Sequence, residues 1–264
     1  MKLVQGKQSA THHAEMKDSE RRIADNLAAV RARIAAAATA SGRSADQITL
    51  VAATKYVSAT HAAALVAAGC HDLGESRPQE LWSKAGALSE SAGRVAAQTS
   101  DAVRSPVRWH LIGHLQRNKI RRTLPLVHLI QSVDSRRLIE ALEAEAALLG
   151  RPVSVLVEIN VSGDDAKTGL PAAELEALVA DAPRWPHVAI RGLMGMASLA
   201  GGLDAARRDF ERLRTLRDRV ARAVPPGVSL AELSMGMSED FEVAIECGAT
   251  IIRVGSALFE GCEP

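Results

Sequence analysis

The sequence predicts an α/β protein folded as a single (β/α)8 barrel. Eight short segments rich in aliphatic and β-branched residues alternate with segments of helical periodicity, which is the pattern of parallel strands joined by helices. The chain has 264 residues, and single barrels of this kind commonly run to about 250 residues. A doubly wound open sheet is the alternative fold.

The expected strands and helices follow one another along the chain. We expect strands over residues 48–54, 72–75, 108–113, 129–134, 154–160, 190–196, 232–236 and 250–255. The helical patterns between them cover residues 59–68, 77–86, 116–122, 135–149, 171–181, 204–223 and 239–247. Residues 83–108 form an unusually long connection, which we interpret as a helix extended by a mobile loop.

The N-terminal region divides into two parts. Residues 1–18 are polar and aperiodic, and we expect a disordered tail there. A helix opens near Ser19 and runs to about Ala40, with apolar residues at helical spacing: Ile23, Leu27, Val30 and Ile34. Residues 19–264 are then one barrel domain, in which this helix covers the gap left by a short last helix.

The composition argues against several classes of partner. The net charge is +1, so the chain has no charge footprint for nucleic acid or an anionic membrane. Its three cysteines have no metal-ligand spacing and leave one unpaired in any disulfide scheme, which suits a reducing compartment. We see neither a signal peptide nor the roughly 18 apolar residues of a membrane span. We expect a cytoplasmic protein.

Lys55 is the first candidate for chemistry. It is one of seven lysines and follows the uncharged run "LVAAT" at the end of the first expected strand. In a barrel the strand C-termini form the functional mouth. A lysine can lose its proton there, whereas an arginine cannot. The plainer interpretation is a strand-end lysine whose amine reaches water.

A candidate anion site follows the last two strands. "SMGMSEDFEVAIECG" places Ser238 at an expected helix N-cap, and "RVGSALFEG" places Gly255 and Ser256 after the eighth strand. Phosphate sites of barrels often form at these two loops. The alternative is ordinary helix capping. An amine and a phosphate site at one mouth suit Schiff-base chemistry, with pyridoxal phosphate (PLP) or, in a cofactor-free aldolase, with a sugar phosphate.

Six stretches occur in an order that resembles the pyridoxal phosphate homeostasis proteins. They are "LVAATKYVS", "DLGESRPQE", "WHLIGHLQRNK", "VEINVSGDDAKTGL", "IRGLMGM" and "LSMGMSEDFEVAIECGATIIRVGSALFEG". The resemblance covers about Ile23 to Gly261. It implies a barrel like that of the fold-type III alanine racemases, here without their C-terminal β domain.

The resemblance also implies roles for individual residues. Lys55 matches the lysine that holds PLP as a Schiff base. Ser238, Gly255 and Ser256 match the phosphate-binding positions, although the last is often Thr in the family. Arg253 matches an arginine that faces the pyridine nitrogen. His110 and Met235 lie in signature motifs, and we expect both, together with Ser76, among the cofactor-binding residues without assigning them a specific role. Ser76 and Arg77 depart from the pattern, because relatives usually read "GENY" where this chain has "GESR".

The function implied by the resemblance is intracellular homeostasis of PLP, a form of vitamin B6, by a monomeric carrier or buffer. We expect no efficient catalysis, and apo PLP enzymes as acceptors. A cation at the pyridine nitrogen makes the ring a poorer electron sink. Racemases of this kind use a tyrosine as a second acid/base, and Tyr56, next to Lys55, is poorly placed for that role because it should point to the opposite strand face. The alternative is a PLP-dependent enzyme similar to an amino-acid racemase. We interpret Lys119 and Lys167 as solvated cations. The alternative is that they bind a second PLP molecule or an acidic group of a partner.

Overall fold

The computed structural model describes residues 2–96, 107–161, 168–198, 201–225 and 228–262, with the side chains of residues 2–15 and 92–96 excepted. Its central sheet contains β1 (Thr49–Ala53), β2 (Asp72–Glu75), β3 (Arg108–Leu111), β4 (Val127–Val133), β5 (Val153–Asn160), β7 (Val188–Met194), β8 (Glu232–Ser234) and β9 (Ile251–Val254). A two-residue strand, β6 (Leu170–Pro171), pairs with the end of β5.

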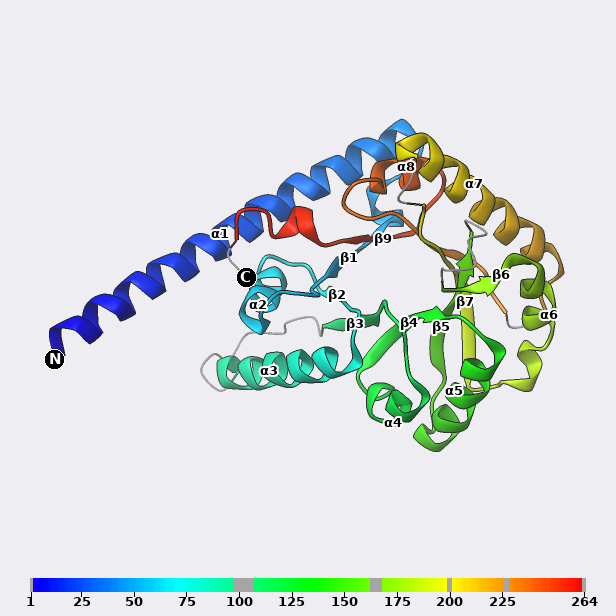
Figure 1. Cartoon of the computed structure of the whole chain (residues 1–264), viewed down its shortest axis with the longest axis horizontal. Helices are drawn as coiled ribbons and strands as arrows, with labels where there is room; N and C mark the ends of the chain where they lie inside the picture. Colours follow the sequence, from blue (N-terminus) through cyan, green and yellow to red (C-terminus); the bar gives the residue numbers. More distant parts are fainter. Residues whose placement is uncertain (1, 97–106, 162–167, 199–200, 226–227, 263–264) are drawn as a thin grey trace.

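The sheet closes on itself. Its strand order is β4-β3-β2-β1-β9-β8-β7-β5, and a further pairing between β4 and β5 completes the ring. Every pairing is parallel. The predicted eight-stranded barrel is therefore confirmed, and the open sheet is wrong (Figure 1).

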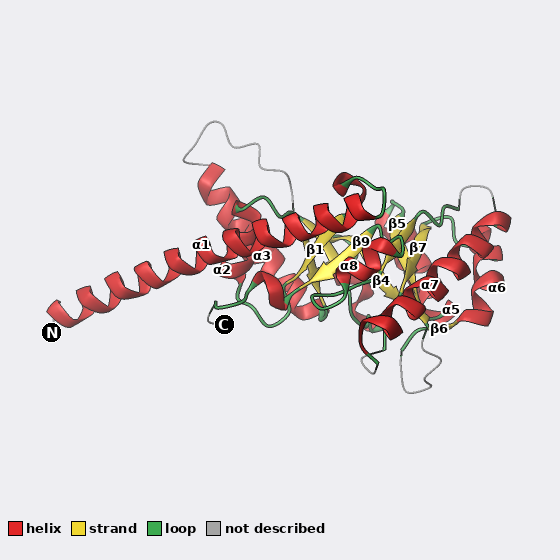
Figure 2. Cartoon of the chain, turned by 90° about the horizontal axis from the view of Figure 1, so that it is seen from above, coloured by secondary structure: helices red, strands yellow, loops and turns green. Residues whose placement is uncertain are grey.

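Helices cover the outside of the strands (Figure 2). They are α1 (Lys2–Ala40), α2 (Ala59–Ala67), α3 (Pro78–Ala96), α4 (Ile120–Thr123), α5 (Arg136–Leu149), α6 (Leu175–Ala180), α7 (Gly202–Val220) and α8 (Phe241–Glu246). Local sequence sets several of their ends. The Ser135 hydroxyl accepts a hydrogen bond from Leu138 N at the start of α5, and Gly150 ends that helix in the left-handed conformation.

Helix α1 differs from the expectation at its start. It begins at Lys2 instead of near Ser19, and residues 2–18 contain one glycine and no proline to interrupt a helix. Its expected apolar face is buried, and the helix packs against α2 and α8. The division into a disordered tail and one barrel domain stays a prediction.

Helix α3 extends the expected helix well beyond residue 86, to Ala96. The expected mobile loop falls largely on residues 97–106, which lie outside the described part of the chain. In that described part, no helix combines the length and the apolar character needed to cross a membrane.

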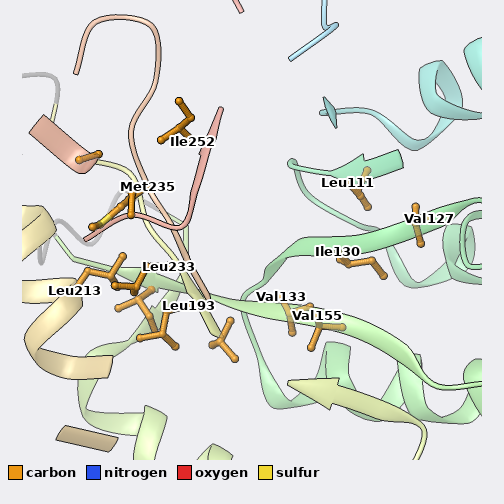
Figure 3. Packing of buried hydrophobic residues seen from close by; sticks show 14 of the residues in the cluster. Leu111, Val127, Ile130, Val133, Val155, Leu193, Leu213, Leu233, Met235 and Ile252 are labelled. Atoms are coloured by element: carbon orange, nitrogen blue, oxygen red, sulfur yellow. The ribbon is translucent and has the colours of Figure 1, made fainter. Parts of the chain in front are cut away.

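The barrel has two apolar layers. A small inner cluster is made of side chains that point into the barrel: Val51, Leu129, Leu156, Met194 and Ile251. A much larger cluster fills the space between strands and helices, and Figure 3 shows part of it. Successive side chains of a strand point to opposite faces of the sheet, so every second residue of each strand points into the barrel. Some of these inward-pointing residues are polar and buried, as the site described below shows.

Candidate functional site

All strands run in the same direction, so the loops that follow them meet at one mouth. Strand β1 lies between β2 and β9. The loops that carry Lys55, Ser76 and Gly255 are therefore neighbours, although they are far apart in the sequence. The structure thus brings Lys55, Ser76 and Gly255 together at this mouth from the ends of three different strands.

Lys55 lies in the turn just after β1, and its side chain is exposed. Tyr56 has a φ of 72° and is 79% exposed, which is an uncommon conformation for a bulky residue. The Lys55 Nζ lies 5.8 Å from the centre of the Tyr56 ring. The expectation that the two side chains point to opposite strand faces is wrong, because β1 ends at Ala53 and both residues belong to the turn.

A buried ion pair lies beneath this turn. Lys84 Nζ of α3 donates to the Thr54 carbonyl oxygen at 2.8 Å and to Glu75 Oε1 at 2.5 Å. Thr54 Oγ1 donates to the same carboxylate oxygen at 2.7 Å. The pair thus holds the backbone of the residue that precedes Lys55. Above it lies a cavity of about 260 Å³, whose lining includes Lys55 and Ser76.

Lys84 is not among the site residues predicted from the sequence. The signal was its position three residues after Leu81, on the apolar face of an amphipathic helix. A lysine at such a position needs a buried acceptor, and Glu75 at the end of β2 supplies one.

Two loops that carry residues of the predicted anion site are in contact. The Gly255 backbone N donates to Ser238 Oγ at 3.1 Å. A side chain at Gly255 would meet the Ala53 carbonyl oxygen at 3.3 Å, so glycine permits the close approach of this loop to the end of β1. Ser256 follows at the first position of a 3-10 turn, Ser256–Leu258, and is exposed.

The expected role of Ser238 as a helix N-cap is wrong. Helix α8 begins at Phe241 with Asp240 as its N-cap residue, and the Asp240 carboxylate accepts from Met237 N at 2.6 Å. Burial raises the pKa of Asp240, which the bond from Met237 N and the charge of Arg253 partly oppose. Ser238 is therefore free of capping and serves the loop after β9 instead.

Arg253 is a buried cation inside the barrel. Its Nη1 donates to Ser234 Oγ at 2.6 Å and its Nη2 to the Gly195 carbonyl oxygen at 3.1 Å. Burial lowers its pKa to about 10, against the opposing charges of Glu158 and Asp240, so the guanidinium stays protonated at neutral pH. Burial also raises the pKa of Glu158. The mouth therefore carries a fixed positive charge that two carboxyl groups face.

The remaining predicted residues lie in different surroundings. His110 is buried inside the barrel, where its ring contacts Asp72 and Gln131. Met235 lies in the outer apolar cluster with Leu193, Leu213 and Leu233 (Figure 3). Ser76 lines the cavity beside Lys55, and its backbone packs tightly against Gly113. Whether His110, Met235 and Ser76 touch a cofactor stays a prediction.

The motifs contain two further lysines. Lys119 ends a 3-10 turn, Arg117–Lys119, before α4, and Lys167 lies outside the described residues. In the described part of the chain, no group of His, Cys, Asp and Glu side chains could hold a metal ion.

The sequence was compared with known protein families. Residues 25–263 match the family described as "Alanine racemase, N-terminal domain". The chain belongs to this family. The match spans the barrel from within α1 to beyond β9.

Relatives of similar length carry one shared name. The chain is 38% identical over 251 residues to a "Pyridoxal phosphate homeostasis protein" of Mycobacterium leprae, covering 91% of this chain and 93% of that protein. It is 34% identical over 237 residues to the protein of the same name from Escherichia coli, covering 90% and 95%. The resemblance expected from the motifs is confirmed.

Solved structures agree with the fold. A protein of Bifidobacterium adolescentis described as unknown superposes with a TM-score of 0.82 at 38% identity, covering 91% of this chain and 96% of that one. PipY of Synechococcus elongatus, solved with PLP bound, gives a TM-score of 0.76 at 32% identity, covering 90% and 99%. Alanine racemase of Corynebacterium glutamicum is 16% identical with a TM-score of 0.63, and the match covers 62% of its length, which shows the shared barrel alone.

Proposed function

We propose that this protein binds pyridoxal 5′-phosphate at the barrel mouth, covalently through Lys55, and serves PLP homeostasis as a carrier or buffer. The observation that carries the proposal is the PLP-bound structure of PipY, a relative of 32% identity over 90% of this chain, together with Lys55 at the barrel mouth of this chain. The relatives named for PLP homeostasis support the same function.

The residues at the mouth fit the cofactor chemically. Ser238 and Gly255 bring a hydroxyl and a backbone N–H together, and exposed Ser256 adds a second hydroxyl beside them. These are donor types that phosphate oxygens accept from. Lys55 lies in the loop after β1, adjacent to this cradle through the pairing of β1 with β9. Its amine can attack the cofactor aldehyde, whose oxygen leaves as water.

The charge of Arg253 supports a carrier more than an enzyme. When bound, PLP supplies an electron sink for reactions of amino acids, and that capacity depends on a protonated pyridine nitrogen. A guanidinium that faces this nitrogen disfavours its protonation. The exposed Tyr56, whose ring lies near the Lys55 amine, is the observation that keeps a racemase-like enzyme as the second candidate, since it places a second proton carrier beside the lysine.

The test is the visible absorption of the protein with PLP, before and after reduction with borohydride. We expect Lys55→Ala to fold normally and to lose the absorption of the covalently bound cofactor. Lys119→Ala is the matched control and should keep it. Peptide mapping after reduction should place the cofactor on Lys55, and an adduct on Lys119 or Lys167 would contradict the proposal.

A further inference from the structure

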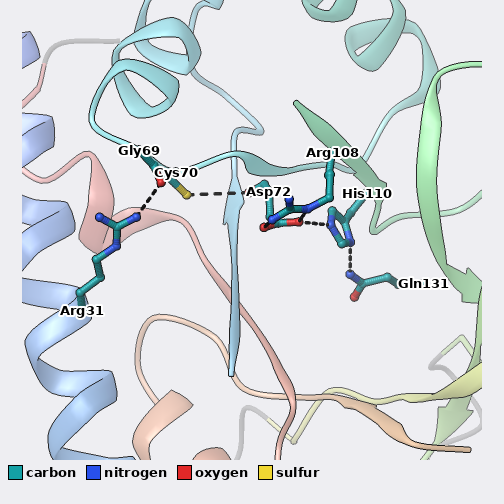
Figure 4. Close-up of polar contacts among 7 residues, drawn as sticks. All are labelled: Arg31, Gly69, Cys70, Asp72, Arg108, His110 and Gln131. Atoms are coloured by element: carbon teal, nitrogen blue, oxygen red, sulfur yellow. Dashed lines mark hydrogen bonds and ion pairs between the residues drawn. The ribbon is translucent and has the colours of Figure 1, made fainter. Parts of the chain in front are cut away.

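A row of buried polar side chains crosses the inside of the barrel, from the mouth toward the strand N-termini. Arg253 Nη1 lies 2.6 Å from Ser234 Oγ, which lies 2.6 Å from Gln131 Oε1. Gln131 Nε2 lies 3.0 Å from His110 Nδ1, and His110 Nε2 lies 3.0 Å from Asp72 Oδ1. Figure 4 shows the part of this row from Gln131 through His110 to Asp72, where Arg108 also donates to the Asp72 carboxylate.

Each hydrogen bond in the row has a determined direction. The guanidinium of Arg253 can only donate, so the Ser234 hydroxyl accepts from it and donates its own proton to Gln131 Oε1. The Gln131 amide nitrogen then donates to His110 Nδ1. The row therefore runs one way, from a cation at the mouth toward the strand N-termini.

The carboxylate of Asp72 fixes the other end. Burial by itself raises its pKa, but hydrogen bonds from His110 and Arg108 outweigh that effect and lower the pKa to about 2. An ionised carboxylate only accepts, so His110 Nε2 must carry a proton. His110 is thus a neutral ring with Nε2–H, and its Nδ1 lone pair accepts from Gln131.

The reversed arrangement satisfies fewer groups. A flipped Gln131 amide would donate to Ser234 and accept from a doubly protonated His110. Ser234 would then accept twice, and its own proton would lose its partner in a side chain that is fully buried. The charged and titratable groups that face His110 are Asp72 from β2, Arg108 from β3 and His128 from β4, whose ring centre is 5.7 Å away.

We propose that His110 is a positioning residue whose neutral Nε2–H form fixes the guanidinium of Arg253 at the mouth through Gln131 and Ser234. This inference rests on the proposed function, in which Arg253 faces the cofactor ring. It assigns the "WH" histidine a role at a distance, and it adds Gln131, Ser234 and Asp72 to the residues on which PLP binding depends.

The direct test needs no cofactor. Nitrogen-15 NMR of the histidine rings distinguishes the two neutral forms from the doubly protonated ring, and a His110→Asn variant assigns the signal. In the PLP-free wild-type protein at neutral pH we expect His110 to carry its proton on Nε2 alone. A proton on Nδ1 would overturn the inference, whatever the protein binds.

Two variants test the effect on the mouth. Gln131→Met keeps the side-chain volume but removes both polar contacts, and Ser234→Ala removes the hydroxyl. Ser234→Ala removes a hydrogen bond to the charged Arg253, and Gln131→Met removes the acceptor that orients the Ser234 hydroxyl. Each should weaken PLP binding by about tenfold, the effect of losing one hydrogen bond to a charged group. Ser234→Thr keeps a hydroxyl and should restore most of the affinity.

Thr123→Val is the matched control. It removes a buried hydroxyl that lies outside the barrel and bonds Trp82 and the Lys119 carbonyl, and it should leave PLP affinity unchanged. Wild-type affinity in both Gln131→Met and Ser234→Ala would overturn the positioning role alone. A wild-type protein that takes up no PLP would overturn the proposed function and this role together.

Discussion

The contact between Ser238 and Gly255 lets us predict how the loss of the Ser238 hydroxyl changes PLP affinity. Ser238→Ala should weaken PLP binding by about tenfold or more, because a good charge-assisted hydrogen bond contributes roughly 1.5–3 kcal/mol. The double variant Ser238→Ala, Ser256→Ala should be weaker still. Titration of the absorbance measures this. Ser41→Ala is the control, since that hydroxyl bonds only backbone carbonyls at the end of α1. Wild-type affinity in the double variant would place the phosphate elsewhere.

Asp72 makes a prediction for pH dependence. Its pKa in the folded protein is about 2, below its usual value of 3.8, so the unfolded chain binds the proton more readily. Its contribution to stability is therefore present above about pH 4 and is lost as the pH falls toward 2. In Asp72→Asn the free energy of unfolding should fall less steeply between about pH 5 and pH 3 than in the wild type.

Urea unfolding at several pH values checks this expectation. Asp46→Asn is the matched control, because Asp46 is exposed and should keep the wild-type pH slope. An Asp72→Asn slope equal to that of the wild type would show that the carboxylate is not held in its charged form by His110 and Arg108.

At the scale of elements, helix α3 is attached to the barrel through Lys84. The side chains of Lys84 and Glu75 are 7% and 1% exposed. Lys84→Met leaves a buried carboxylate without its cation, so the free energy of unfolding should fall by about 3–5 kcal/mol. Lys84→Met combined with Glu75→Gln should recover most of this loss.

Denaturant unfolding measures both variants. Arg121→Met breaks an exposed ion pair with Glu145 and should leave the stability nearly unchanged, because such pairs contribute little. If the single Lys84 variant were as stable as the Arg121 variant, the pair would not anchor the helix.

Elements with clear periodicity could be predicted from the sequence. The strand expected over residues 72–75 matches β2, and the helix expected over 135–149 nearly coincides with α5, because an N-cap serine and a glycine bound it. Strand β6, two residues long, has no periodicity to detect. The sequence predicts the wrong N-cap for α8 because Ser238 and Asp240 both have capping chemistry. In the structure Asp240 occupies the N-cap position without a side-chain bond to the helix, and Ser238 bonds Gly255 N.

The sequence predicts which loops of the site lie together, but it does not predict which side chains meet inside the barrel. Lys55 and Gly255 could be paired because parallel strands end at one mouth. The row from Arg253 to Asp72 could not, since it depends on which inward positions of β2, β3, β4, β8 and β9 face one another. Gln131 in "LIQSV" was a polar residue in an apolar strand, which signals a buried partner without identifying it.

For the whole molecule, the carrier proposal predicts exchange of the cofactor instead of turnover of a substrate. Incubation with L-amino acids in deuterated water should show no α-proton exchange at about 1 per second or faster, the low end of ordinary enzymes. Incubation with an apo PLP enzyme should transfer the cofactor. NMR of the α-proton and the regained activity of the acceptor measure the two outcomes.

Exchange at enzymatic rates would favour the racemase-like alternative. The variant Tyr56→Phe would then test whether that tyrosine is the second proton carrier.

The pairing of the first strand with the last has a consequence for how the protein matures. Thr49 is in register with Ile251, so the lysine and the phosphate cradle come from regions that the ribosome makes early and late. Neither half can form the site by itself, and we expect a nascent chain to acquire cofactor only after β9 has docked. Such long-range closure is slow to form, and a ligand that binds only the closed ring stabilises it by mass action. The supply of vitamin B6 in the cell would thereby influence how long each newly made copy stays closed.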